Sequence, residues 1–239
     1  MARPMKRIIV VTLINAALLS LISCGSAEDE KAVCVFDKAS VYDKPSKKEG
    51  KWISSVSLGE KVKFLDDKVD NDDKKKRNYY KVELLDGKEG WIQSDFVALN
   101  SVPAVATEKI EIYNRPDLST ITKKIFEPLD IIALGERKEG WVEVTGKRQK
   151  GKWIDKGWIK EKGYSEKDRD IAAALFINRA ITKPKKEQVV EELRKIQENS
   201  DLSGSAFEER IEEIITKLSG NTVPVVTQPA VVDSEEGEE

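Results

Sequence analysis

The order of hydrophobic and polar residues changes along the chain. Residues 8–22 form one aliphatic stretch, whereas residues 32–163 alternate short apolar runs with polar turns. From residue 165 to residue 219 the apolar positions recur every three or four residues, and beyond residue 220 no period remains. Because a period of two is typical of strands and a period near 3.6 is typical of helices, the pattern predicts a β region followed by an α region.

The β region contains an internal duplication, in which residues 32–99 and residues 104–163 share one succession of short motifs. The first copy contains Val41-Tyr42, Leu58-Gly59-Glu60, Tyr79-Tyr80-Lys81-Val82 and Gly90-Trp91-Ile92. The second copy contains Ile112-Tyr113, Pro128-Leu129-Asp130, Trp141-Val142-Glu143-Val144 and Gly157-Trp158-Ile159. The short strands of each copy can bury one face only by curling into a small barrel.

On these motifs, both copies resemble bacterial SH3-like domains. The resemblance rests on an aromatic residue in the first strand, a leucine-glycine start to a later strand, and a closing glycine-tryptophan-aliphatic strand. The second copy departs from the family where Pro128-Leu129-Asp130 replaces the usual glycine. The resemblance implies two tandem SH3-like β-barrels, each with a ligand groove lined by its loops.

Residues 165–219 carry three apolar segments at helical spacing. Ser205 and Glu208 have the spacing of a capping box, and Gly220 follows the last apolar position. We expect a short helical bundle or a helical hairpin packed on the second barrel. The apolar segments are Ile171 to Ile177, then Val189, Val190, Leu193 and Ile196, and finally Phe207, Ile211, Ile214, Ile215 and Leu218.

The aliphatic stretch near the N-terminus has the features of an export signal. Three basic residues precede it, and its fifteen residues are fewer than the about 20 that a membrane-spanning helix needs. The run Leu21-Ile22-Ser23-Cys24 resembles the lipobox of bacterial lipoproteins. This resemblance implies that residues 1–23 are a lipoprotein signal peptide, that Cys24 is acylated, and that residues 24–31 are a linker.

An acylated Cys24 would hold the protein at a membrane, since stable attachment needs about two acyl chains and a diacylglyceryl group supplies both. We expect the rest of the chain to be water-soluble, in the cell envelope, on the periplasmic side or at the surface. Gly25, rather than aspartate, follows Cys24, as in lipoproteins released to the outer membrane. The outer membrane is therefore slightly favoured over the inner membrane.

The charge distribution separates the folded part from the C-terminal segment. Removing the three bases of the signal changes the net charge from −2 to −5. Residues 220–239 contain five acids and no base, so the remaining residues are electrically balanced, and nucleic acid is not an expected partner. Because the same segment combines proline, valine and acids without a period, we expect a disordered acidic tail.

The composition argues against an enzyme. The chain has no histidine, which removes the usual general base and the usual zinc ligand. Cys34 lies in a Val-Cys-Val-Phe run, which favours a small buried hydrophobic residue over a reactive thiol. The aspartate-rich loop 66–73 is not an EF-hand, because Lys75 stands where that loop requires glycine. We expect no catalytic residue, no metal and no cofactor.

Aromatic residues beside bases are the candidate binding residues. Trp52 and Trp153 each follow a loop rich in lysine, and such rings can stack on a ligand while the bases attract carboxylates. For these two tryptophans a core position and a binding position both remain open, whereas Trp91, Trp141 and Trp158 are predicted in the barrel cores. The ligand-binding candidates are Trp52, Tyr80, Trp153, Lys150 and Lys152.

Three hypotheses for the function follow. The first is a membrane-anchored, non-enzymatic envelope lipoprotein that binds peptidoglycan or an envelope protein through its tandem SH3-like domains. The second is an assembly lipoprotein that oligomerises through its C-terminal helices. The third is a surface adhesin.

Overall fold

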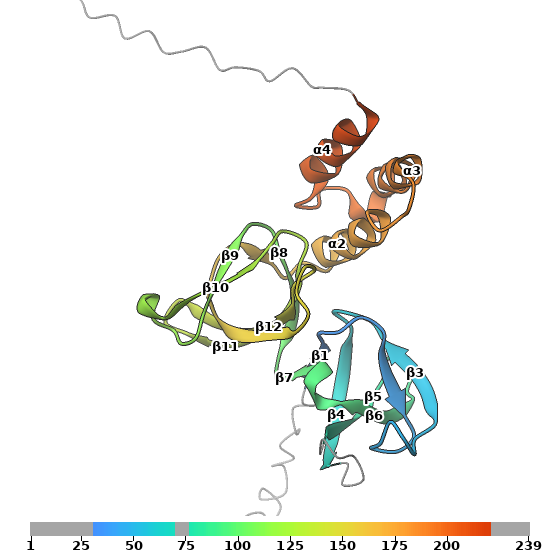
Figure 1. Ribbon diagram of the computed structural model, residues 1–239, viewed down its shortest axis with the longest axis vertical. Helices are drawn as coiled ribbons and strands as arrows, with labels where there is room; N and C mark the ends of the chain where they lie inside the picture. Colours follow the sequence, from blue (N-terminus) through green and yellow to red (C-terminus); the bar gives the residue numbers. More distant parts are fainter. Residues whose placement is uncertain (1–30, 70–76, 221–239) are drawn as a thin grey trace, which may run out of the picture.

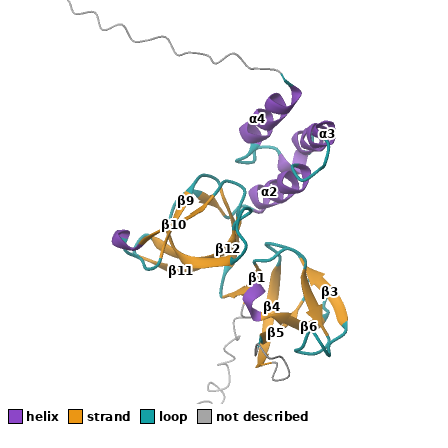
Figure 2. Cartoon of the chain, in the orientation of Figure 1, coloured by secondary structure: helices purple, strands orange, loops and turns teal. Residues whose placement is uncertain are grey.

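A computed structural model describes residues 31–69 and 77–220. The described chain forms two antiparallel sheets, and three α-helices follow them in the sequence (Figures 1 and 2). This confirms the predicted order of β region and α region. The signal peptide, Cys24 and residues 221–239 of the acidic tail lie outside the described residues, as do residues 70–73 of the aspartate-rich loop.

The first sheet, here called the first β-domain, has the strand order β3-β2-β6-β5-β4-β1-β7. A short 3-10 helix, η1 (Ser94–Phe96), precedes its last strand. The strands are β1 (Lys31–Cys34), β2 (Ala39–Tyr42), β3 (Trp52–Val56), β4 (Lys61–Val69), β5 (Asn78–Glu83), β6 (Glu89–Gln93) and β7 (Val97–Leu99).

The second sheet, here called the second β-domain, has the order β10-β9-β13-β12-β11-β8-β14. This is the order of the first sheet with every strand number raised by seven, so the duplication seen in the sequence is also present in the topology. The strands are β8 (Val102–Ala106), β9 (Ile110–Tyr113), β10 (Ile121–Phe126), β11 (Ile131–Lys138), β12 (Trp141–Lys147), β13 (Ile154–Lys160) and β14 (Tyr164–Ser165), with η2 (Leu118–Thr120) between β9 and β10.

Equivalent turns lead into β4 and β11. Gly59 and Leu129 occupy the same place in these turns, with φ angles of 79° and 77°. The backbone N–H of Gly59 donates to the carbonyl of Cys34 (2.8 Å), and that of Leu129 donates to the carbonyl of Ala106 (2.9 Å). The second copy has Leu129 where the first copy has Gly59, and the turn has the same backbone conformation in both.

Leu129 holds a left-handed conformation that a side chain ordinarily disfavours. Its side chain is buried against the helices, and its carbonyl accepts a hydrogen bond from Nδ2 of Asn178 (2.9 Å). This burial offsets the backbone strain and explains how leucine can replace the glycine found at residue 59.

The glycine of each glycine-tryptophan pair lies where two strands come close together. A Cβ atom on Gly90 would lie 3.0 Å from the carbonyl oxygen of Tyr42, and one on Gly157 would lie 2.6 Å from that of Tyr113. Since these oxygens belong to the neighbouring strand, they cannot move aside cheaply. Glycine at both positions is therefore a requirement of the strand packing.

The three helices are α2 (Asp168–Ala180), α3 (Lys186–Gln197) and α4 (Glu208–Ser219), with η3 (Ser200–Leu202) before α4. Gly220 follows the last residue of α4, as predicted, and it has a left-handed backbone conformation. The predicted capping box is wrong in detail, because α4 begins at Glu208 and the Glu208 carboxylate accepts from the backbone N–H of Gly204 rather than that of Ser205.

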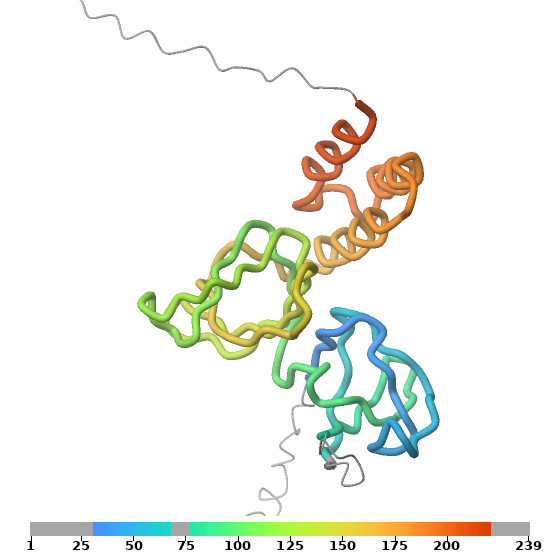
Figure 3. The backbone as a smooth tube through the Cα atoms, in the orientation of Figure 1, coloured from blue at the N-terminus to red at the C-terminus, as the bar shows by residue number. Residues whose placement is uncertain are grey.

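The helices share their hydrophobic core with the second β-domain, as expected from the sequence. Val105, Leu129 and Ile131 of that domain lie in one buried cluster with residues of all three helices, and Leu58 of the first β-domain packs against it. The main helical members are Ile171, Ala174, Ile177, Leu193, Phe207 and Ile211. Figure 3 follows the chain from the first β-domain through the second to these helices.

The two β-domains also contact each other directly. Val33, Val35 and Ala98 of the first domain form a small buried cluster with Ala133 of the second. The Nζ atom of Lys147 lies 4.7 Å from the centre of the Phe36 ring, across the same boundary. The three parts of the chain are therefore packed against one another. No helix among the described residues is both long and apolar enough to span a membrane.

Candidate functional site

Three aromatic side chains lie in a row across the first β-domain. Trp52 on β3 is directly opposite Tyr42 on β2, and Tyr42 is directly opposite Trp91 on β6. Opposite residues of antiparallel strands share a face, and adjacent strands are about 4.8 Å apart, so the row spans about 10 Å. Trp52 is 64% exposed, while Tyr42 and Trp91 are half-buried. We call these three residues the aromatic row.

Trp91 was predicted in the barrel core, and this is wrong. Its neighbour Ile92 is fully buried, and Ile92 pairs with Val41, which is also in the core. Because successive side chains of a strand point to opposite faces, Tyr42 and Trp91 must point outward. The alternation of side chains along the strand predicts that Trp91 and its buried neighbour Ile92 point to opposite faces. The large apolar side chain of tryptophan instead led to the prediction of a core position.

The loop between β2 and β3 holds Trp52 in place. The N–H of Lys51 donates to Oδ1 of Asp43 (2.7 Å), and the N–H of Lys47 donates to the hydroxyl of the buried Tyr79 (3.1 Å). The loop is also closed by a backbone hydrogen bond from Gly50 to Ser46 (2.9 Å). The loop carries four exposed lysines, together with the exposed acids Asp43 and Glu49. The lysines are Lys44, Lys47, Lys48 and Lys51.

Tyr80 lies on the other face of the same sheet. It pairs with Ile92, and its ring makes an edge-to-face contact with Phe64, with ring centres 5.2 Å apart. Burial raises the pKa of its hydroxyl, and the nearby carboxylates of Asp67 and Asp95 raise it further. Tyr80 and Trp52 therefore do not form one surface.

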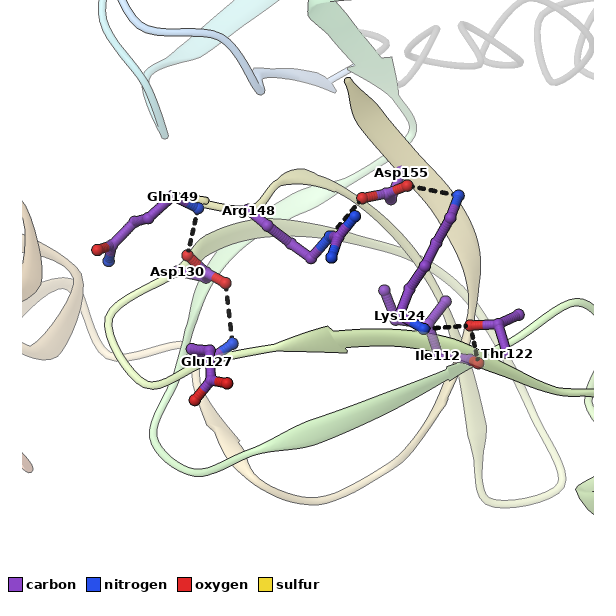
Figure 4. A network of polar contacts seen from close by, with 8 residues as sticks. All are labelled: Ile112, Thr122, Lys124, Glu127, Asp130, Arg148, Gln149 and Asp155. Carbon is purple, nitrogen blue, oxygen red and sulfur yellow. Dashed lines mark hydrogen bonds and ion pairs between the residues drawn. The ribbon is translucent and has the colours of Figure 1, made fainter. Parts of the chain in front are cut away.

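Trp153, Lys150 and Lys152 lie in the loop between β12 and β13, where all three are exposed and Trp153 reaches 79%. Figure 4 shows how the base of this loop is held. Nε of Arg148 pairs with Oδ2 of Asp155 at 2.7 Å, and the N–H of Gln149 donates to Oδ1 of Asp130 at 2.9 Å. The five predicted binding residues thus lie on three different parts of the fold.

Residues 37–98 match the family model described as "Bacterial SH3 domain". The match begins just before β2 and ends within β7, so it covers the strands that carry the aromatic row. Residues 37–98 form a bacterial SH3 domain. The match supports the resemblance of the first copy and does not extend to the second β-domain.

Two solved structures are similar to the chain at low levels. NlpC2 from Trichomonas vaginalis is 14% identical with a TM-score of 0.24, over 64% of this chain and 56% of that protein. NlpC1 from the same organism is 13% identical with a TM-score of 0.24, over 63% of this chain and 52% of that protein. The chain thus spans little more than half the length of either protein. No curated protein matches the sequence at a significant level.

The second β-domain does not repeat the aromatic row of the SH3 domain. The position of Trp52 is taken by Ile121, which lies opposite Tyr113, and Tyr113 is buried. The ring of Tyr113 packs edge-to-face on Trp141 (4.9 Å between centres), and Nζ of Lys160 lies 3.6 Å from the centre of the Trp141 ring. Trp141 is buried, as predicted, but it packs against Tyr113 and Lys160 and is not part of the core cluster of the domain. Trp158, which was also predicted in the core, is half-buried.

Cys34 lies within the core of the SH3 domain's sheet. Its side chain is fully buried, and its Sγ is 3.0 Å from the carbonyl oxygen of Phe36. Burial raises the pKa of the thiol to about 12, so the nucleophilic thiolate is scarcely populated at neutral pH. Cys34 is a packing residue, as the sequence indicated. Among the described residues, no group of three acidic or cysteine side chains is placed to hold a metal.

Asp155 forms ion pairs with Lys124 and with Arg148, and Arg148 is part of the loop that carries Trp153. Burial of its carboxyl raises the pKa, but the hydrogen bonds and charges of Lys124 and Arg148 outweigh burial, and the pKa is lowered overall. The two ion pairs measure 2.6 Å to Lys124 and 2.7 Å to Arg148 (Figure 4). By contrast, burial dominates at Asp130 and raises its pKa. These pairs could not be predicted from the sequence, because Lys124 lies on β10, Asp155 lies on β13, and Arg148 lies in the loop after β12.

We predict that Asp155→Asn destabilises the protein by about 1–2 kcal/mol near neutral pH, since two charge-assisted contacts with half-exposed partners are lost. A carboxyl with a lowered pKa stabilises the folded state above its ordinary pKa of about 3.9, and this contribution disappears as the pH falls through the lowered value. Denaturant unfolding at several pH values should therefore show that the difference in unfolding free energy between variant and wild type shrinks below about pH 4.

Asp168→Asn is the control, because it removes an exposed ion pair with Lys61 in which the two charged atoms are 3.6 Å apart. This variant should change the unfolding free energy little at any pH. An equal loss for both variants would contradict the role of Asp155.

Proposed function

We propose that the protein is a non-enzymatic cell-envelope lipoprotein that binds peptidoglycan through the SH3 domain. The observation that carries this proposal is the aromatic row of Trp52, Tyr42 and Trp91, beside a loop with four exposed lysines. Flat aromatic faces stack on sugar rings, and lysines attract carboxylates. Peptidoglycan combines sugar rings with carboxylate-bearing peptide stems, so it fits both parts of this surface.

The second β-domain is, in this proposal, a second SH3-like barrel. The shared strand order and the equivalent turns at Gly59 and Leu129 support this assignment. At the equivalent position of the second β-domain, Tyr113 and Trp141 pack against each other and are buried, so they do not offer an exposed aromatic surface. We therefore assign binding of the polymer to the SH3 domain, and to the second barrel the role of holding that domain and the helices.

The proposal includes no catalytic step. It is supported by the absence of histidine from the sequence and by the burial of Cys34, which leave the described residues without an accessible cysteine–histidine pair. It also includes a lipid on Cys24 in the cell envelope, with the outer membrane favoured. The sequence features of the signal and lipobox support that anchor.

Oligomerisation through the helices is a weaker proposal. The helices place their apolar stripes in the core that they share with the second β-domain. This packing leaves a smaller apolar surface for a second copy of the chain than the isolated helices would offer.

We predict that Trp52→Ala reduces co-sedimentation of the full chain with purified peptidoglycan by about tenfold, because a large exposed anchor of the row is lost. Leu118→Ala is a matched control, since Leu118 is also 64% exposed but lies in the second β-domain. Unchanged sedimentation of the Trp52→Ala variant would exclude the aromatic row as the binding surface.

We also predict that a labelled fatty acid is incorporated into the wild-type protein in cells and that Cys24→Ser abolishes this labelling. The wild-type protein should remain in the membrane fraction until detergent is added, because two acyl chains hold it there. Cys34→Ser provides the control and should retain the label. Labelling of the Cys24→Ser variant, or an unlabelled wild-type protein in the soluble fraction, would disprove the anchor.

A further inference from the structure

A polar cleft lies where the two β-domains meet, apart from the aromatic row. Its volume is about 220 Å³, and both domains contribute side chains to it. The SH3 domain supplies Tyr80, Ser94, Asp95 and the last strand, and the second β-domain supplies Gly135, Glu143, Thr145 and Lys156, with Ser101 between the two.

The contact between the domains fixes the walls of this cleft. Ala98 of the SH3 domain borders the cleft and is also buried in the cluster that contains Ala133 of the second β-domain. Glu143 and Lys156 lie on adjacent strands of the second β-domain, where Lys156 pairs with Thr145 and Glu143 is two residues before Thr145. These side chains therefore project from one face toward the SH3 domain.

The cleft contains charges of both signs that have no ion-pair partner within the described part of the chain. Asp95 accepts one hydrogen bond from the amide of Gln93 (3.1 Å), and neither Glu143 nor Lys156 has a hydrogen bond or an ion pair from its side chain. Tyr80, Ser94 and Thr145 also line the cleft, and their hydroxyls are additional donors and acceptors. A ligand that carries both an ammonium and a carboxylate would complement this arrangement.

We propose that the cleft binds a short peptide segment with a free amine and a free carboxylate. The amine lies between the carboxylates of Asp95 and Glu143, and the carboxylate lies on the ammonium of Lys156. The volume corresponds to about seven water molecules in the liquid, which is room for one or two small residues and not for a folded partner. This inference deepens the proposed function and rests on it in naming peptidoglycan stems as the source of such segments.

The test uses calorimetric titration of the full chain, in detergent, with the zwitterionic dipeptide alanyl-alanine. We expect binding to the wild-type protein, and about tenfold weaker binding for Glu143→Gln and for Lys156→Met, because each variant loses one charge-assisted contact. Glu136→Gln and Lys162→Met are the matched controls, since both residues are exposed in the same domain outside the cleft. N-acetyl-alanyl-alanine amide, which has neither charge, should not bind.

Several results would overturn the inference: no heat with alanyl-alanine, equal binding of the blocked dipeptide, or equal losses in the cleft variants and their controls. Near-ultraviolet circular dichroism of each variant establishes that the domains remain folded. The dipeptide titration does not involve Trp52, so its failure is distinguishable from failure of the sedimentation experiment. Binding of alanyl-alanine by a Trp52→Ala variant that no longer sediments with peptidoglycan would retain the cleft and reject the aromatic row.

Discussion

Burial of β11 on both faces is the constraint on which the arrangement of the molecule depends. Ile131 faces the core shared with the helices, and Ala133 faces the SH3 domain. The alternate residues Ile132 and Leu134 face the core of the second β-domain itself. A domain of about 60 residues buries only about 60% of its unfolded surface and is marginal alone, so these outside contacts stabilise each part through its neighbours.

The position of both proposed binding surfaces follows from this packing. The aromatic row lies on the outer face of β2, β3 and β6, while β1 and β7, at the other end of the sheet's strand order, contact the second β-domain. The polar cleft exists because the two domains meet along that second edge. The loop of Trp153 is joined to the helices through Gln149, whose side-chain amide donates to Asn178 (2.9 Å). The aromatic row and the polar cleft have no residue in common.

Much of the fold could be predicted from the sequence, because periodicity and repeated motifs are local signals. The duplication, the helical stripes and the end of α4 at Gly220 are examples. The interfaces could not be predicted in the same way. The run Ile131-Ile132-Ala133-Leu134 indicates burial on both faces, but the elements that cover each face are set by tertiary packing. Tyr80 was predicted as a ligand-binding residue, and its place in an interdomain cleft could not be predicted, because the second wall of that cleft comes from residues more than 50 positions away.

Amide hydrogen exchange in an Ala133→Asp variant tests the interdomain packing most directly. An unpaired charge at this buried site of the second β-domain disfavours contact with Val33, Val35 and Ala98. The account predicts faster exchange in β1 and β7 of the SH3 domain while β12 and β13 stay protected, and no such change for Val102→Asp, because Val102 is 39% exposed. Wild-type exchange in β1 and β7 of the Ala133→Asp variant would contradict a shared packing of the domains.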